Sequence, residues 1–157
     1  MNPSISKTVQ PQGCTNLKLR QLTRRVTQLY DARVGKSGLK TTQFSLLTAV
    51  ERMGPLQPGA LARTLGLQAS TLTRNLKPLL AAGLLHLGPG ADGRSRLVEI
   101  TAAGRAKRAE AKSMWKSAQI ELNQILGEER VAALHAWIDE SLALLAPVAT
   151  EEDSDED

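Results

Sequence analysis

The sequence predicts a mainly α-helical protein of six helices, with one short β-hairpin inserted among them. Three observations lead to this fold class. Apolar residues recur every three or four positions along most of the 157-residue chain, which is the period of a helix with one buried face. They are chiefly leucine and alanine, with one Phe, one Tyr and two Trp, a composition that favours helices packed on helices. The exception is the region 84–100, where two short apolar runs flank a glycine-rich turn.

The first two predicted helices each follow short polar residues. Residues 15–34 form the first, and Thr15 or Asn16 can cap it, because their side-chain oxygens accept hydrogen bonds from the free amides of a first turn. Residues 41–52 form the second, with Thr41 as its cap. The apolar positions on one side of these helices are Leu19, Leu22, Val26, Leu29 and Tyr30, then Phe44, Leu46, Leu47 and Val50.

Two shorter helices come next. Pro58 suits the first turn of a helix at 59–65, and Gly66 separates it from a fourth helix at 68–82. Pro78 lies inside that fourth helix, where it removes a main-chain hydrogen bond, so we expect a kink. The buried side should hold Leu72, Leu76, Leu79, Leu80 and Gly83.

The hairpin follows the fourth helix. Residues 84–87 and 97–100 are the expected strands, and the sequence GPGADGRSR lies between them. Its Asp92 and Gly93 are a strong signal for a tight turn, because glycine readily adopts the positive φ that such turns need. Thr101 then caps a fifth helix to about residue 125, and a sixth runs from about 128 to 145.

Charge and composition narrow the class of protein. The last seven residues hold six of the 16 acidic side chains, so the other 150 residues carry 20 basic against 10 acidic groups. This basic body suits a nucleic acid, although charge for solubility alone would give the same balance. The single cysteine excludes an intramolecular disulfide, and there is no apolar signal or span, so we expect a cytoplasmic protein outside the membrane.

Two short helices joined at a glycine and followed by a hairpin are the order of a winged helix-turn-helix, whose second helix can enter the major groove of DNA. Hydroxyl, arginine and lysine side chains read base edges and phosphates. The fourth helix should present Ser70, Thr71, Arg74 and Lys77 outward, with Asn75 at the margin. An ordinary solvated helix face would show the same residues, so this helix alone leaves both interpretations open.

The turn of the hairpin adds two arginines. Arg94 and Arg96 lie on a thin basic loop that can reach an adjacent minor groove, whose negative potential attracts arginine. Asp92 would repel phosphate unless it orients Arg94 through a hydrogen-bonded ion pair. Asp92 could instead serve only the turn, and the sequence supports either role.

The runs LARTLGLQASTLTRNLKPLLAAGLL and DGRSRLVEITAAGR together resemble the MarR family of bacterial transcription regulators. The matching features are Gly83 and Leu84 after the recognition helix, the D-x-R wing, and the segment that ends at Gly104. With LKLRQLTRRVTQLYDARVGKSGLKTTQFSLL, the resemblance covers about residues 14–146. Ser95 departs from the family, in which many members carry a charged residue there, and this puts only fine wing contacts in doubt.

The resemblance implies a homodimer, formed by the first, fifth and sixth helices, that binds a palindromic operator. It also implies repression relieved by a small ligand, often an aromatic acid, or by an oxidant. The expected organisation is a flexible arm (1–13), one domain (14–146) with a winged part at about 41–101 and dimerisation helices at about 15–34 and 102–146, and a disordered acidic tail (147–157). The apolar seam expected in the C-terminal helices comprises Leu122, Ile125, Leu126, Val131, Leu134, Ile138, Leu142 and Leu145. Packing within one subunit would explain some of these equally well.

Two triggers remain open within this interpretation. Tyr30, Arg33 and Trp115 could line an effector cleft, with the arginine pairing with a carboxylate and the rings stacking on the ligand. Each of them could equally be an ordinary core or surface residue. Some relatives sense peroxides through a cysteine at the start of the first helix, and Cys14, close in sequence to Lys18 and Arg20, could act in this way or be an inert thiol.

Other functions find less support in the sequence. Two histidines and one cysteine, far apart in the chain, do not suggest a metal site, and we expect no cofactor. No nucleophile with a base, phosphate loop or carboxylate pair suggests an enzyme. The alternative is a winged-helix module that binds an acidic protein partner, but such a surface should expose apolar anchors rather than hydroxyls and arginines.

Overall fold

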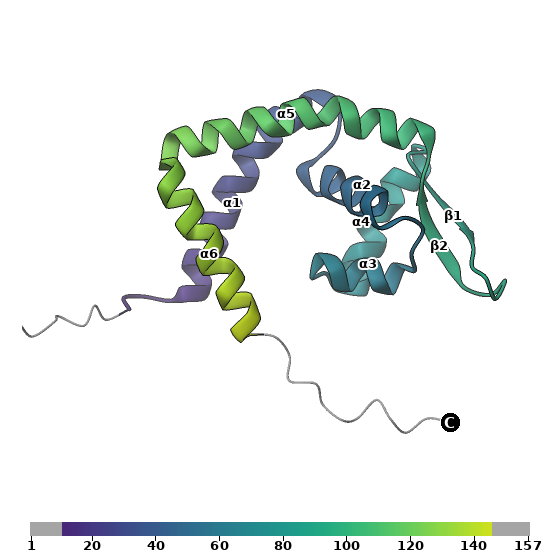
Figure 1. The fold of residues 1–157 in the computed structure, drawn as a ribbon, viewed down its shortest axis with the longest axis horizontal. Helices are drawn as coiled ribbons and strands as arrows, with labels where there is room; N and C mark the ends of the chain where they lie inside the picture. The colour runs from purple at the N-terminus through teal and green to yellow at the C-terminus, as the bar shows by residue number, and fades with distance from the viewer. Residues whose placement is uncertain (1–10, 146–157) are drawn as a thin grey trace, which may run out of the picture. The chain divides into compact units, whose positions relative to one another are not determined.

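The computed structural model describes residues 11–145 and has the predicted architecture (Figure 1). The described residues form six α-helices, one short 3-10 helix and a two-stranded antiparallel sheet. In chain order these are α1 (Thr15–Val34), η1 (Gly35–Ser37), α2 (Thr41–Met53), α3 (Pro58–Leu65), α4 (Ala69–Ala81), β1 (Leu85–Pro89), β2 (Arg96–Ile100), α5 (Ala102–Leu126) and α6 (Glu128–Leu144). The mainly helical fold class with a hairpin wing is confirmed. None of the described helices has both the length and the apolar character needed to cross a membrane.

The chain divides into two compact units after Ala118. The first unit holds α1 to α4, the hairpin and most of α5, and the second holds the end of α5 and α6. The tail predicted for 147–157, and the predicted arm as far as residue 10, lie outside the described residues. Residues 11–13 precede α1 without regular secondary structure.

The N-terminus of α1 differs from the prediction. The helix begins at Thr15, and its N-cap is Cys14 rather than Thr15 or Asn16. Cys14 has an extended backbone, and its carbonyl accepts a hydrogen bond from the Lys18 amide at 3.1 Å, but no side chain caps this end. If the Thr15 hydroxyl were the cap, the helix would begin at Asn16. It begins one residue earlier, at Thr15.

The start of α2 is capped from outside the helix. The Asp31 carboxylate of α1 accepts hydrogen bonds from the Thr41 amide at 2.8 Å and from the Thr41 hydroxyl at 2.7 Å. Gln43 adds a second cap, because its side-chain oxygen accepts a hydrogen bond from the Lys40 amide at 2.8 Å. Thr41 is thus the first helical residue and not the predicted cap, since a carboxylate ten residues earlier supplies the acceptor.

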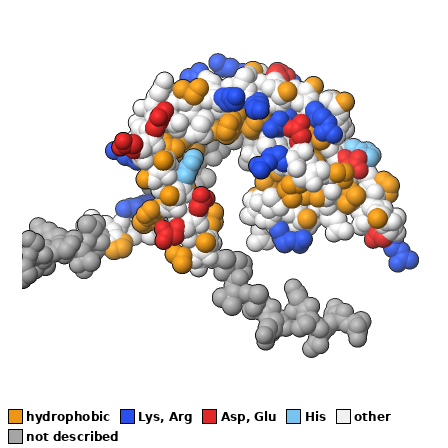
Figure 2. Space-filling view, in the orientation of Figure 1, with side chains coloured by type: hydrophobic (Ala, Val, Ile, Leu, Met, Phe, Trp, Pro, Cys, Tyr) orange, Lys and Arg blue, Asp and Glu red, His pale blue; other side chains and the backbone are white. Residues whose placement is uncertain are grey.

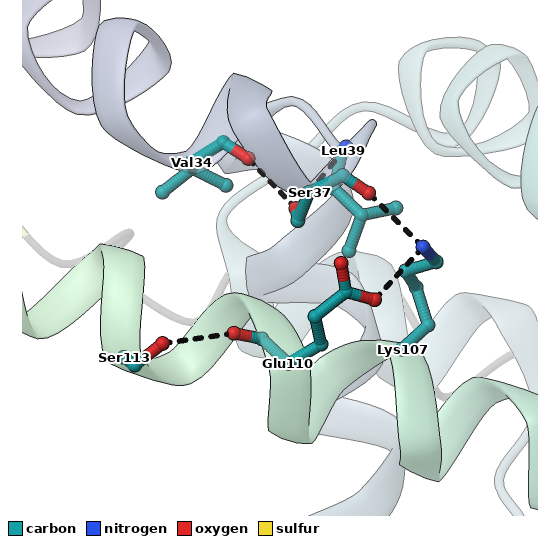
Figure 3. A network of polar contacts seen from close by, with 6 residues as sticks. All are labelled: Val34, Ser37, Leu39, Lys107, Glu110 and Ser113. Atoms are coloured by element: carbon teal, nitrogen blue, oxygen red, sulfur yellow. Dashed lines mark hydrogen bonds and ion pairs between the residues drawn. The ribbon is translucent and has the colours of Figure 1, made fainter.

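A small polar network fastens α5 to the connection between α1 and α2 (Figure 3). The Lys107 ammonium of α5 donates hydrogen bonds to the Ser37 carbonyl at 3.1 Å and to the Glu110 carboxylate at 3.0 Å. The buried Ser37 hydroxyl donates to the Val34 carbonyl at 2.7 Å. The hydroxyl and the carbonyl of Ser37 therefore both have hydrogen-bond partners inside the protein. These bonds hold the connection that follows α1 against α5.

The core of the first unit lies between α2, α3, α4, the end of α1 and the base of the hairpin. The fully buried large side chains are Leu46, Leu47, Leu61, Leu72, Leu79, Val34, Val50 and Val98. The inward sets predicted for α2 and for Leu72, Leu76 and Leu79 of α4 are buried. Gly83 was predicted on the buried side of α4 but is exposed, because the helix has already ended and Gly83 turns the chain with a φ of +67°.

The hairpin is slightly longer than predicted. Its strands pair from Leu85 with Ile100 to Pro89 with Arg96. Leu56 joins the sheet as an isolated bridge: its amide donates to the Val98 carbonyl at 3.3 Å, and the Val98 amide donates to its carbonyl at 2.8 Å. The base of the wing is thereby tied to the loop between α2 and α3.

Thr101 joins the wing to α5 and caps that helix as predicted. Its hydroxyl oxygen accepts a hydrogen bond from the Gly104 amide at 3.0 Å and donates to the Gly83 carbonyl at 2.6 Å. Gly104 is buried against the Leu84 carbonyl, and a Cβ there would also lie 2.8 Å from an Ile100 side-chain carbon. Only glycine fits this approach, so the Thr101–Gly104 segment sets where α5 leaves the wing.

The second unit leaves much of its apolar surface uncovered. Of the predicted seam, Val131 is buried, whereas the exposed members are Ile125, Ile138, Leu142 and Leu145. Trp137 of α6 is 74% exposed. In α1 the N-terminal Leu17 and Leu19 are also more than half exposed. Residues 11–145 of one chain therefore leave these faces uncovered.

Candidate nucleic-acid interface

The helix α4 carries a polar face opposite its leucines. Leu72, Leu76 and Leu79 are buried, so the helix is held with a fixed orientation against the core. The exposed positions on the other side include Ser70, Thr73, Arg74 and Lys77, and Thr71 and Asn75 are partly buried at its margins. Five of the predicted contact residues thus lie on or beside one surface, and Ser70, Arg74 and Lys77 are its most accessible members.

Thr73 belongs to this face but is absent from the predicted contact set. It lies three positions after Ser70 and four before Lys77, which is the spacing that brings residues to one side of a helix. Helical periodicity could have identified it. Its hydroxyl donates a hydrogen bond to the Ala69 carbonyl at 2.9 Å.

The turn before α4 gives the helix its free N-terminus. Gly66 ends α3 with a φ of +61°, and the Leu67 amide returns to the Ala62 carbonyl at 2.8 Å. Gln68 is the N-cap of α4, and no side chain caps its first amides. These amides and the positive end of the helix dipole remain available to an anionic group such as a phosphate.

Pro78 does not end α4 early. The helix continues for three residues beyond it, to Ala81, and the Ala82 amide donates to the Pro78 carbonyl at 3.0 Å. The polar residues before the proline and the leucines after it therefore belong to one helix.

The wing tip is ordered by Asp92 through the main chain. One Asp92 oxygen accepts hydrogen bonds from the Ser95 hydroxyl at 2.6 Å, the Ser95 amide at 2.8 Å and the Arg94 amide at 3.0 Å. The Ser95 hydroxyl, then the Ser95 and Arg94 amides, hold the pKa of the Asp92 carboxyl below its usual value. A Cβ at Gly90 would collide with the Ser95 hydroxyl that Asp92 holds, and the Gly90 amide donates to the Ser95 carbonyl at 2.8 Å.

This geometry corrects the predicted role of Asp92. Within the described chain no ion pair joins its carboxylate to the Arg94 guanidinium, because Asp92 bonds the backbone of the turn. Asp92 therefore positions Arg94 through the main chain. The side chains of Arg94 and Arg96 are exposed, and Figure 2 shows basic side chains at the tip of the hairpin.

The charge of this part of the chain is one-sided. Between residues 58 and 98 there are five basic side chains, Arg63, Arg74, Lys77, Arg94 and Arg96, and the single acid is Asp92. The carboxylate of that acid already accepts hydrogen bonds from the turn. Both α4 and the wing tip thus offer an unbalanced positive surface, which attracts a polyanion.

An open pocket of about 520 Å³ lies between α2, α3 and α5. Its lining comprises Phe44, Ser45, Thr48, Ala49, Arg52, Met53, Thr64, Leu65 and Trp115. Phe44 stacks on Trp115 with ring centroids 6.0 Å apart and an interplanar angle of 28°. The pocket thus combines an aromatic wall with hydroxyls and one guanidinium, that of Arg52.

Only one of the three predicted effector residues lines this pocket. Trp115 does, whereas Tyr30 is buried behind it, with ring centroids 6.4 Å apart, and Arg33 is not part of the lining. Burial raises the pKa of the Tyr30 hydroxyl. The sequence pattern missed Phe44 and Arg52, because the pocket is formed by helices that meet only in the folded chain.

Two further features considered in the sequence are the single cysteine and a metal site. Cys14 is an exposed free thiol at the N-cap of α1. Residues 11–145 contain no group of three His, Cys, Asp or Glu side chains that could hold a metal ion.

The half-buried contact between α5 and α2 lies beside the pocket. Arg108 forms an ion pair with Glu51 at 2.6 Å, and its Nε donates to the Thr48 hydroxyl at 3.2 Å. Thr48 also lines the pocket. A hydrogen bond therefore joins the pocket wall to α5, the helix that follows the wing.

Comparison with known proteins places this geometry in a family. A family model described as the MarR family matches residues 37–95. The M. tuberculosis transcriptional regulator MosR, solved in complex with DNA, is 32% identical, with a TM-score of 0.72, and the match covers 86% of this chain and 100% of that chain. A probable transcriptional regulator from Pseudomonas aeruginosa is 25% identical, with a TM-score of 0.73, and the match covers 81% of this chain and 96% of that chain.

Mutant MarR from E. coli, complexed with operator DNA, shares the fold at 21% identity, with a TM-score of 0.74 over 81% of this chain and 92% of that chain. A search of curated proteins found no match. The likeness to MosR exceeds 30% identity over the whole of that relative and agrees with the family model. The chain therefore belongs to the MarR family of DNA-binding, winged helix-turn-helix transcriptional regulators.

Proposed function

We propose that this chain is a homodimeric repressor that binds a palindromic operator and is released from it by a small ligand. The observation that carries the proposal is the polar, basic face of α4, which buried leucines hold against the core, together with an arginine-tipped wing whose turn is ordered by Asp92. MosR and mutant MarR were both solved in complex with DNA, which supports the same use of the fold here. Members of this family regulate transcription and are not enzymes.

The recognition residues divide by chemistry. Arg74 would form two hydrogen bonds with a guanine edge, and Lys77 would contact a phosphate. Ser70, Thr71 and Asn75 complete the surface of α4, while Arg94 and Arg96 suit the adjacent minor groove. The alternative, a module for an acidic protein, is less well supported, because no large hydrophobic side chain is exposed on α3, α4 or the hairpin.

The test begins by selecting bound duplexes from a random DNA pool. On the selected operator, Arg74→Ala should cost about 1–3 kcal/mol and relax preference at one base pair per half-site. Lys77→Ala should weaken all duplexes and reduce the salt slope by about one, because one phosphate contact is lost. Lys112→Ala, which removes an exposed charge of α5, is the control. Wild-type binding by both α4 variants would show that this face does not contact DNA.

The dimer is supported by the uncovered apolar side chains of α1 and α6. Burying them against a second copy would remove a large apolar area from water. Sedimentation should give the mass of a dimer at micromolar concentration, and Leu142→Glu should shift it towards the monomer. Glu140→Gln on the same helix is the control. A monomeric wild-type chain at these concentrations would contradict the proposal.

For the effector, the pocket between α2, α3 and α5 favours an aromatic carboxylate. Arg52 would pair with the carboxylate, and Phe44 and Trp115 would contact the ring. Since α3 supplies part of the lining, an occupant that displaces α3 would also move α4, the neighbouring helix. The ligand must bind the DNA-free conformation more tightly than the DNA-bound one, because a ligand with equal affinity for both does not change their populations.

Adding benzoate or peroxide to the protein–operator complex distinguishes a ligand-binding pocket from a redox-sensitive thiol as the sensor. Benzoate should release both wild type and Cys14→Ser from the operator if the pocket is the sensor, and Arg52→Ala should abolish this effect while Arg33→Ala keeps it. Peroxide should release wild type but not Cys14→Ser if the exposed thiol is the sensor. If neither compound changes operator affinity, the ligand switch is rejected and DNA binding alone remains.

A further inference from the structure

The exposed Thr73 side chain on α4 has a restricted hydrogen-bonding capacity. A threonine hydroxyl carries one hydrogen, and in Thr73 that hydrogen is donated to the Ala69 carbonyl at 2.9 Å. What Thr73 can offer to a partner outside the helix is therefore its methyl group and an acceptor oxygen. Unlike the neighbouring Arg74, it has no donor free for a base edge.

Thr73 lies on one flank of the proposed reading surface. It lies between Ser70 and Lys77 along the exposed side of α4 and directly precedes Arg74. The buried leucines on either side, Leu72 and Leu76, prevent the helix from rotating this position away. A methyl group is thus held at the edge of a face whose other exposed members are polar or charged.

The major groove contains one apolar group that such a methyl can recognise. Thymine presents its C5-methyl there, whereas the other base edges present hydrogen-bond donors and acceptors. Building on the proposed function, we infer that Thr73 is a specificity-determining residue that reads the C5-methyl of a thymine next to the base pair contacted by Arg74. The intrahelical hydrogen bond of its hydroxyl is what leaves the methyl as the reading group.

Replacing single thymines with uracil tests this directly, because it removes only the C5-methyl. In the selected operator, one dT→dU replacement per half-site should weaken wild-type binding about fourfold, which corresponds to roughly 0.8 kcal/mol for one buried methyl group. Thr73→Ser keeps the hydroxyl and removes the methyl, so it should lose about the same factor and become insensitive to that replacement. Thr73→Val keeps a methyl and removes the hydroxyl, so it should remain sensitive.

The outcomes separate this inference from the proposed function. If no thymine replacement affects wild type, or if Thr73→Ser responds to uracil as wild type does, the methyl contact is disproved while operator binding stands. If Thr73→Val loses the response and Thr73→Ser keeps it, the hydroxyl reads the base and the inference is overturned. If no duplex is selected from the pool, the proposed function fails, and this inference fails with it.

Discussion

Thr101→Ala tests whether the junction between the wing and α5 is held by one hydroxyl. The alanine loses the cap to the Gly104 amide at 3.0 Å and the hydrogen bond to the Gly83 carbonyl at 2.6 Å. A lost helix cap costs about 1 kcal/mol. The exposed Gly83 carbonyl can bind water instead, so losing its hydrogen bond to Thr101 adds only about a few tenths of a kcal/mol to the cost. We expect Thr101→Ala to lower the free energy of unfolding by about 1–2 kcal/mol.

Urea unfolding followed by circular dichroism measures this loss at a fixed protein concentration, because the stability of the proposed dimer would depend on concentration. Thr101→Ser is the matched control: it keeps the hydroxyl and should lose less than about 0.5 kcal/mol. Equal midpoints for wild type and Thr101→Ala would show that the cap does not hold the junction. A serine variant as unstable as the alanine variant would assign the effect to the methyl group instead.

Three further changes follow from the same structure. Gly104→Ala would press a methyl group against a main-chain carbonyl, so it should destabilise the fold by about 2 kcal/mol or more in urea. Glu51→Gln weakens the half-buried ion pair with Arg108 and should cost about 1–2 kcal/mol by the same measurement. Asp92 has a lowered pKa, so the turn it orders should persist at pH values above the ordinary carboxyl pKa and loosen as the pH falls through the lowered one. The Ser95 amide resonance should report that transition by NMR.

Two of these changes have a matched control. Glu110→Gln removes a more exposed ion pair with Lys107 and should cost less than about 1 kcal/mol, so equal losses for the two glutamates would contradict the argument from burial. In Ser95→Ala the midpoint of the Asp92 transition should rise, because the hydroxyl is the largest cause of the lowered pKa. An unchanged midpoint would remove the hydroxyl from that role.

Much of the fold follows from local patterns in the sequence. The spacing of Leu72, Leu76 and Leu79 identified the buried side of α4, because neighbouring turns of a helix share one face whatever covers it. The Asp92–Gly93 turn was equally predictable, since its positive φ is a local requirement. The cap by Thr101 also joins residues three apart, so the sequence contains both partners.

Features that join distant residues were not predictable in this way. The Asp31 cap of α2 and the Trp115 wall of the pocket depend on which helices meet, and periodicity shows only that a face is buried. Arg52, not Arg33, lines the pocket for the same reason. The sequence by itself determined the helices, the hairpin and the polar face of α4. Only the tertiary structure decided which helix each apolar face packs against and which group the Asp31 carboxylate caps. The physical reason is that the spacing of residues within a helix is compatible with several packing partners, and the packing of the whole chain selects one of them.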